Sequence, residues 1–136
     1  MAARFLLDTN TIIYIRRQKP ASVMHAFDRL ELGEAALSVI TFGELMYGVA
    51  KSSQREAATQ QLQRIAQLVP VLPLPETAAS VYGTVRAELE SRGQMIGYHD
   101  LWIAAHALAA GLTLVTNNEK EFRRVPGLKI QNWATR

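Results

Sequence analysis

The stretch that decides the fold is RFLLDTN, residues 4–10. Residues 5–7 form an apolar run that is typical of a buried strand, and a new apolar pattern, typical of a helix, begins at Ile12. Asp8 lies at the junction between the two. In an open α/β sheet, ligands bind beyond the carboxyl ends of the strands, so Asp8 is the first candidate for chemistry. The alternative is that Asp8 only caps the helix by accepting backbone N–H bonds.

The composition indicates one ordinary globular domain. The chain has 136 residues, 49% of them hydrophobic and 20% charged, so we expect a single domain over residues 1–136. It contains no cysteine, which excludes a disulfide framework, a zinc–thiolate site and a cysteine nucleophile. There is no signal-peptide pattern and no apolar run long enough to cross a membrane. We therefore expect a cytoplasmic protein without a membrane partner.

Strand and helix patterns alternate along the chain. Short apolar runs predict strands at residues 5–7, 35–39, 71–74, 113–116 and 129–132. Amphipathic or apolar segments predict helices over residues 9–17, 20–30, 41–50, 54–68 and 75–92, and from residue 101 to Gly111. No hairpin signal joins the strands. The sequence therefore predicts an α/β fold with a central parallel sheet of four to five strands, flanked by helices on both faces.

Carboxylates recur at the predicted junctions. Asp8, Glu44 and Asp100 each precede or begin a helix, and the segment after residue 116 supplies Asn117, Asn118 and Glu121. Because parallel strands end at the same edge of a sheet, we expect these side chains to converge. Carboxylates packed together repel one another and stay charged only if a cation neutralises them. Oxygen ligands without cysteine or a histidine cluster select a hard ion such as Mg²⁺ or Mn²⁺.

Four segments in order resemble the motifs of the PIN-domain ribonucleases, specifically the VapC toxins of bacterial toxin–antitoxin pairs. They are LLDTN at 6–10, SVITFGELMYG at 38–48, IGYHDLWIAAHAL at 96–108 and LVTNNEKEFRRVPGLKIQNW at 114–133. The resemblance covers about residues 4–133. It implies a PIN-like fold and metal-dependent endoribonuclease activity.

The resemblance also implies roles for single residues. Asp8, Glu44 and Asp100 become catalytic metal ligands. Many relatives place an Asp where this chain has Asn118, and relatives with Asn there carry an acid three residues on, which here is Glu121. We therefore assign the fourth ligand to Glu121, with Asn118 as its competitor. A supporting polar shell is expected from Asn10, Thr41, Thr116 and Asn118, for which local cap or turn bonds are the alternative.

The implied chemistry is hydrolysis of an RNA phosphodiester. One Mg²⁺ or Mn²⁺ ion, or two at about 3.5–4 Å, would lower the pKa of a water and stabilise the attacking and leaving oxygens. The expected products carry a 5′-phosphate and a 3′-hydroxyl. Sequence-independent phosphate contacts are predicted for two basic clusters, with solvated surface as the alternative: Arg16, Arg17 and Lys19, and Lys120, Arg123 and Arg124.

Partners follow from the same resemblance. It implies an RNA substrate, with tRNA as the main expectation, and a VapB-type antitoxin whose C-terminal segment blocks the acidic pocket. It also implies a homodimer. Tyr14, Met46 and Tyr47 suit either protein contact, unless they lie in the core.

Two histidines near these motifs have open interpretations. His99 precedes Asp100 and is either a proton-transferring or phosphate-binding group or a surface residue of the turn. His106 lies in an alanine-rich segment and is predicted to pack rather than to bind metal.

Three other functions compete with the nuclease. A phosphoacceptor receiver domain needs an Asp closing the third strand, but this strand ends Leu74-Pro75-Glu76. A phosphatase of the haloacid dehalogenase type needs an Asp at position 10, which is Asn10. A PIN-like scaffold that binds RNA or protein without cutting is favoured only by Asn118 and stays as the alternative.

Overall fold

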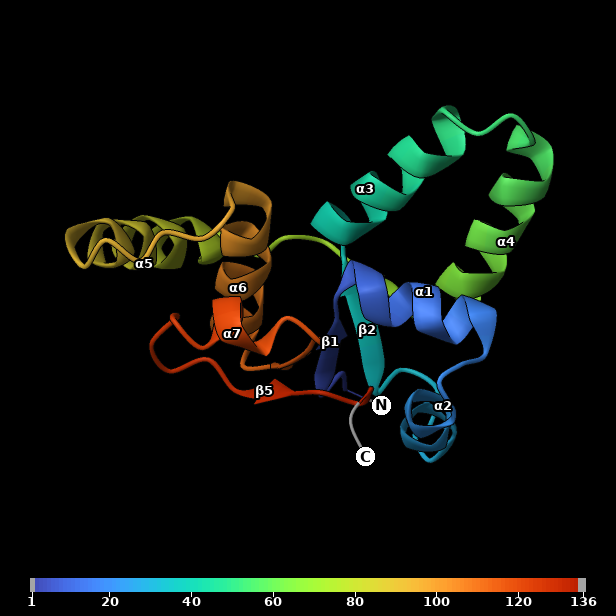
Figure 1. Ribbon diagram of the computed structural model, residues 1–136, viewed down its shortest axis with the longest axis horizontal. Coiled ribbons are helices and arrows are strands. Elements are labelled where there is room, and N and C mark those ends of the chain that lie inside the picture. Colours follow the sequence, from blue (N-terminus) through green and yellow to red (C-terminus); the bar gives the residue numbers. More distant parts are fainter. Residues whose placement is uncertain (1, 135–136) are drawn as a thin grey trace.

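The computed structural model describes residues 2–134 and contains a five-stranded sheet (Figure 1). Its strands are β1 Phe5–Leu7, β2 Ala35–Ser38, β3 Val71–Leu72, β4 Thr113–Val115 and β5 Ile130–Gln131. They lie in the order β3-β2-β1-β4-β5, and every neighbouring pair is parallel. The predicted parallel sheet is confirmed, with β1 at its centre.

Helices cover both faces of the sheet. They are α1 Thr9–Arg17, α2 Ala21–Asp28, α3 Val39–Ala50, α4 Arg55–Leu68, α5 Ala78–Ser91, α6 Tyr98–Ala110 and α7 Glu119–Phe122. Alternate residues of a strand point to opposite faces. Leu6 therefore packs in a core cluster with residues of α5, α6 and α7, whereas Phe5 and Leu7 pack in a second cluster with residues of α1, α2 and α4. No helix in the described part of the chain is long and apolar enough to span a bilayer.

Several elements differ from the sequence pattern. Helix α3 begins at Val39, because Ser38 caps it, so Glu44 lies in its second turn, and β3 and β5 are shorter than predicted. The single turn of α7 is not predicted, because four residues are too few to display a helical period. Helix α5 begins at Ala78 rather than at residue 75, since the Ala78 N–H donates to the Pro75 carbonyl (2.9 Å) in a preceding turn. Helix α6 begins early, at Tyr98, so that Asp100 lies in its first turn.

Helix α3 packs weakly along its length. Of its 12 residues only Thr41 is buried, whereas α6 buries six of its 13, namely Leu101, Ile103, Ala104, Ala105, His106 and Ala107. Figure 1 shows α3 and α4 extending together to one side of the sheet. Helix α3 contacts the core through side chains that are only partly buried, Ile40, Phe42 and Leu45, and it leaves β2 at Ser38.

Candidate active site

Asp8 lies at the carboxyl end of the central strand. Its backbone N–H donates to the Val115 carbonyl (3.0 Å), which holds it against the end of β4. Its Oδ1 accepts from the Thr11 N–H (2.9 Å), so Asp8 is the N-cap of α1. Its carboxylate also bonds the Thr116 hydroxyl, which accepts from the Asn118 N–H (2.9 Å). Asp8 thus caps a helix and also faces a cavity, so the two sequence interpretations do not exclude each other.

Three of the four predicted acids converge on that cavity, whose volume is about 160 Å³. Its walls are Asp8, Thr9, Asn10, Thr41, Glu44, His99, Asp100, Ile103, Asn118 and Phe122. Asp8 comes from the end of β1, Glu44 from α3 and Asp100 from α6. We call this cavity the acidic pocket. Parallel topology therefore brings the three carboxylates to one place, although far apart in sequence.

Glu121 contacts Asp100 and Asn118 but is not among the residues of the pocket wall. Its Oε1 accepts from the Gly97 N–H (3.2 Å) and its Oε2 from Asn118 Nδ2 (3.1 Å), and its carboxylate also shares a hydrogen bond with Asp100. Asn118 itself lines the pocket. The two candidates for the fourth position are therefore neighbours that bond each other, and only Asn118 is a residue of the pocket wall.

Burial and mutual repulsion raise the pKa of two of these acids. Burial, then the hydrogen bond and charge of Glu121, then the charges of Asp8 and Glu44 raise the pKa of Asp100 to about 7. Burial also raises the pKa of Asp8, with a further contribution from Glu44 and opposed by the Thr116 and Thr11 hydrogen bonds. Burial alone would raise the pKa of Glu121, but hydrogen bonds from Asp100, Asn118 and Gly97 outweigh it and lower that pKa. The raised pKa of Asp100 and the lowered pKa of Glu121 favour Asp100 as the donor and Glu121 as the acceptor in the hydrogen bond between them.

The carboxylate of Glu44 contacts a histidine rather than another acid. His99 Nε2 lies 3.0 Å from Glu44 Oε2, with both side chains partly exposed. His99 thus lines the pocket and contacts an acid, which favours its functional interpretation over that of an isolated surface residue. Sequence reasoning missed this contact, because it joins the first turn of α6 to α3.

The donor set suits a hard divalent cation, although the carboxylates engage other groups. Among residues 2–134, no three or more His, Cys, Asp or Glu side chains form a group that could hold a metal ion as they are placed. Apart from His99, the facing side chains nevertheless offer carboxylate, hydroxyl and amide oxygens, and Thr41 Oγ1 is buried on the pocket wall without a hydrogen-bond partner. A cation would relieve the repulsion that raises the pKa of Asp100. To bind the cation, Asp100 and Glu44 would have to give up their contacts with Glu121 and His99. The types of residue present therefore fit the ion.

Two asparagines form a polar ladder at the rim of the pocket. Asn10 Nδ2 donates to Asn117 Oδ1 (3.3 Å), and Asn117 Nδ2 donates to the Tyr14 hydroxyl (2.7 Å). The structure thus places Asn10 and Thr116 beside the acids, as the predicted polar shell requires. Asn117 was expected at this edge of the sheet but was not assigned to the predicted site, because its place directly after Thr116 is the only signal for it.

The two basic clusters differ in how their side chains are engaged. Arg16, Arg17 and Lys19 are exposed at the end of α1. In the second cluster, Lys120 is exposed, but Arg123 Nη2 pairs with Glu119 Oε1 (2.7 Å) and Arg124 Nη1 donates to the Met95 carbonyl (3.0 Å). The α1 cluster is therefore the better placed of the two to contact a phosphate backbone.

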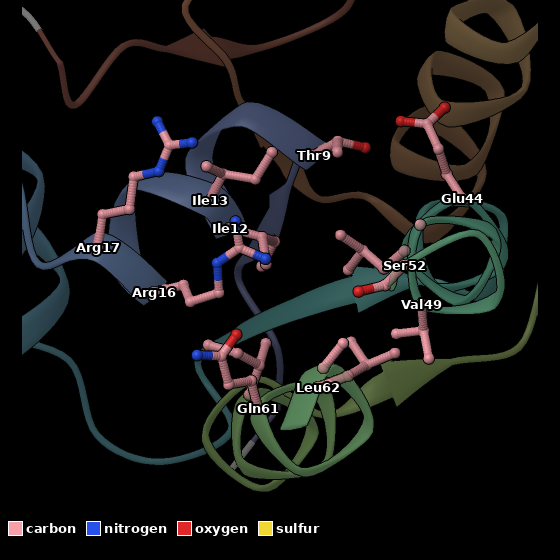
Figure 2. Close-up of a pocket in the computed structure, with 14 residues that line it drawn as sticks. Thr9, Ile12, Ile13, Arg16, Arg17, Glu44, Val49, Ser52, Gln61 and Leu62 are labelled. Atoms are coloured by element: carbon pink, nitrogen blue, oxygen red, sulfur yellow. The ribbon is translucent and has the colours of Figure 1, made fainter. Parts of the chain in front are cut away.

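A larger groove of about 560 Å³ adjoins the acidic pocket (Figure 2). Its apolar walls are Ile12 and Ile13 of α1, Leu45 and Val49 of α3, and Ala58, Leu62 and Ile65 of α4. Arg16 and Arg17 line it on the α1 side, and Glu44 lies on the opposite side. Thr9 and Glu44 line both cavities, so the groove leads into the acidic pocket.

Comparison with known proteins yields one consistent family. A family model described as PIN domain matches residues 5–128. The tRNA(fMet)-specific endonuclease VapC of Shigella flexneri is 40% identical over 131 residues, which are 96% of this chain and 98% of that protein. Ribonuclease VapC2 of Haemophilus influenzae is 36% identical with the same coverage.

Solved structures agree in fold and length. VapBC-1 from nontypeable Haemophilus influenzae gives a TM-score of 0.90 at 34% identity, covering 96% of this chain and 98% of that one. VapBC2 from Rickettsia felis, bound to a DNA fragment from its promoter, gives a TM-score of 0.86 at 36% identity, covering 95% and 98%.

The raised pKa of Asp100 predicts a pH-dependent cost in the folded state. The folded protein holds the Asp100 proton more tightly than the unfolded chain does, so stability is lost as pH rises from near 4 toward about 7. The Asp100→Asn variant has no such proton to lose. We expect its melting temperature, measured in EDTA by calorimetry, to rise relative to that of the parent protein between pH 5 and pH 8. If the melting temperatures of the two proteins changed with pH in parallel, the raised pKa of Asp100 would be wrong.

Proposed function

Because the chain belongs to the PIN-domain family, and within it to the VapC ribonucleases, we propose that it is an endoribonuclease that hydrolyses RNA phosphodiesters at the acidic pocket. One observation carries the proposal: Asp8, Glu44 and Asp100 open on one cavity in a chain that matches the family along nearly its whole length. A site of this kind needs a divalent cation, for which we propose Mg²⁺ or Mn²⁺, as one or two ions.

The proposed ligands are Asp8, Glu44, Asp100 and Glu121. A bound cation would supply an activated water and would neutralise charge on the phosphate. Thr11 and Thr116 fix the orientation of the Asp8 carboxylate by hydrogen bonds. Asp100 must give up the proton that it shares with Glu121 before both can act as charged ligands, so cation binding is expected to release a proton.

The proposed substrate is RNA of the tRNA class. We also propose that the protein acts in the cytoplasm. The Shigella flexneri and Salmonella typhimurium relatives are both named tRNA(fMet)-specific endonucleases. Arg16, Arg17 and Lys19 are exposed near the groove that leads to the acidic pocket, where they would contact phosphates without reading sequence. Cleavage would leave a 5′-phosphate and a 3′-hydroxyl.

The proposed protein partner is a VapB-type antitoxin, because the solved relatives are VapBC complexes. The groove between α1, α3 and α4 has apolar walls and a basic rim, which suit an amphipathic helix with acidic flanking residues. A segment lying there would pass Thr9 and Glu44 at the entrance to the acidic pocket. We also propose a homodimer, for which the exposed Met46 and Tyr47 of α3 (48% and 63% exposed) offer apolar surface.

The first prediction concerns the acids. Asp8→Asn and Asp100→Asn should each lower Mg²⁺-dependent cleavage of a structured RNA by more than about 100-fold, because each removes a charged ligand. Asp28→Asn, the same change on α2 away from the pocket, is the matched control. Undiminished cleavage by the Asp8 variant, or in excess EDTA, would refute the catalytic assignment. RNA binding without any cleavage by the parent protein would favour the scaffold alternative.

A second prediction separates the two candidates for the fourth position. If Glu121 is a ligand, Glu121→Gln should lose most activity, whereas Asn118→Ala should lose less, because the Glu121 charge remains. Single-turnover cleavage rates over a Mn²⁺ titration measure both effects. Activity that survives in Glu121→Gln but not in Asn118→Ala would move the fourth position to Asn118.

A third prediction tests the groove. Val49→Glu places a charge on its apolar wall, and burying that charge against a helix without a partner is costly. Affinity for the co-expressed VapB-type antitoxin should therefore fall by about tenfold or more, as measured by calorimetry. Ala50→Glu adds the same charge at the next position, which is exposed and outside the groove, and should bind as the parent does. Equal affinities for both variants would place the antitoxin elsewhere.

A further inference from the structure

A buried hydrogen bond joins α6 to the start of α3. His106 Nδ1 lies 2.8 Å from Ser38 Oγ, and both residues are buried, at 1% and 0% exposure. Ser38 ends β2 and is the N-cap of α3, where its Oγ accepts from the Ile40 N–H (3.1 Å). Since Oγ already accepts one bond, its own hydrogen is available for a neutral imidazole at Nδ1.

The two partners belong to helices with very different support. Helix α6 is fixed in the core by its buried residues and carries Asp100 in its first turn. Helix α3 carries Glu44, yet buries only Thr41. The apolar residues of α3 that pack on the core, Ile40, Phe42 and Leu45, are only partly buried, so a change in the direction of α3 at Ser38 would displace Glu44 from Asp100.

We propose that the Ser38–His106 hydrogen bond has a positioning role: it fixes the position of Glu44 on α3 relative to Asp100 on α6. The bond ties α3, at the residue where it leaves β2, to α6, which also contacts α3 through the Glu44–His99 pair. His106 does not line the acidic pocket, so it acts through the helix and does not touch substrate. The inference rests on the proposed function, because the register matters only if the acids share a cation.

A histidine that merely fills the core makes a different prediction. Its replacement would lower stability, as any loss of core packing does, but would leave the affinity of the acids for a cation unchanged. The distinguishing quantity is therefore the dissociation constant for Mn²⁺, measured on the full chain by electron paramagnetic resonance, without RNA and without turnover.

The experiment compares variants that remove the bond with variants that keep it. His106→Leu and Ser38→Ala each remove it, and Mn²⁺ should bind about three- to tenfold more weakly, the range expected for one hydrogen bond. His106→Asn, whose amide offers a polar atom close to the position of Nδ1, should recover part of the loss. The double variant His106→Leu/Ser38→Ala should bind little worse than either single variant, because the two act on one interaction.

Val23→Ala is the matched control for stability. It removes buried methyl groups from α2, which carries no acid of the pocket, so it should lower the melting temperature and leave Mn²⁺ affinity unchanged. If His106→Leu does not fold, Ser38→Ala and His106→Asn still test the bond. Unchanged Mn²⁺ affinity in all bond-removing variants, or an equal loss in Val23→Ala, would overturn the positioning role. A parent protein that binds no Mn²⁺ would instead overturn the cation site proposed above, and this role with it.

Discussion

The pairing of β1 with parallel neighbours on both sides is the constraint on which the rest of the structure depends. Phe5 and Leu6 are in register with β2 and with β4, and the buried strand cannot slip without moving every side chain to the wrong face. The carboxyl ends of β1, β2 and β4 therefore lie at one edge. The segments that follow these strands therefore start at that edge. They are Asp8 after β1, α3 after β2 and Thr116 after β4.

This arrangement creates an electrostatic problem that the protein resolves in three ways. Asp8 is held by hydrogen bonds from threonines, Asp100 and Glu121 share a proton, and Glu44 contacts His99. All of these contacts leave the acids in place and the pocket polar. Such a site keeps its carboxylates at a cost in stability, which is typical of a functional site. A divalent cation could replace the shared proton and the histidine contact at once, which is why the site suits the proposed chemistry.

The sequence was sufficient for features that depend on local pattern or on the rule that parallel strands end together. The buried run before Asp8 predicts β1, and alternating strands and helices predict the sheet, so the meeting of Asp8, Glu44 and Asp100 follows from topology. The contacts that sequence reasoning missed are between side chains on different elements. The bonds of Glu121 to Gly97 and Asp100 depend on the single turn of α7, which has no periodic signal. Likewise, Arg123 pairs with Glu119 and Arg124 donates to the Met95 carbonyl, contacts that the sequence of this basic cluster does not reveal.

Helix α3 connects the two cavities physically. It supplies Glu44 to the acidic pocket and Leu45 and Val49 to the groove, and Glu44 itself borders both. Only one residue of α3 is fully buried, and its exposed side is free to receive a partner. On the proposed function, an antitoxin segment in the groove would therefore act in two ways. It would cover the entrance beside Thr9, and it would press on the helix whose direction sets the distance between Glu44 and the other acids. On the proposed function, partner binding and cation binding would therefore be coupled through α3, because this one helix borders both cavities.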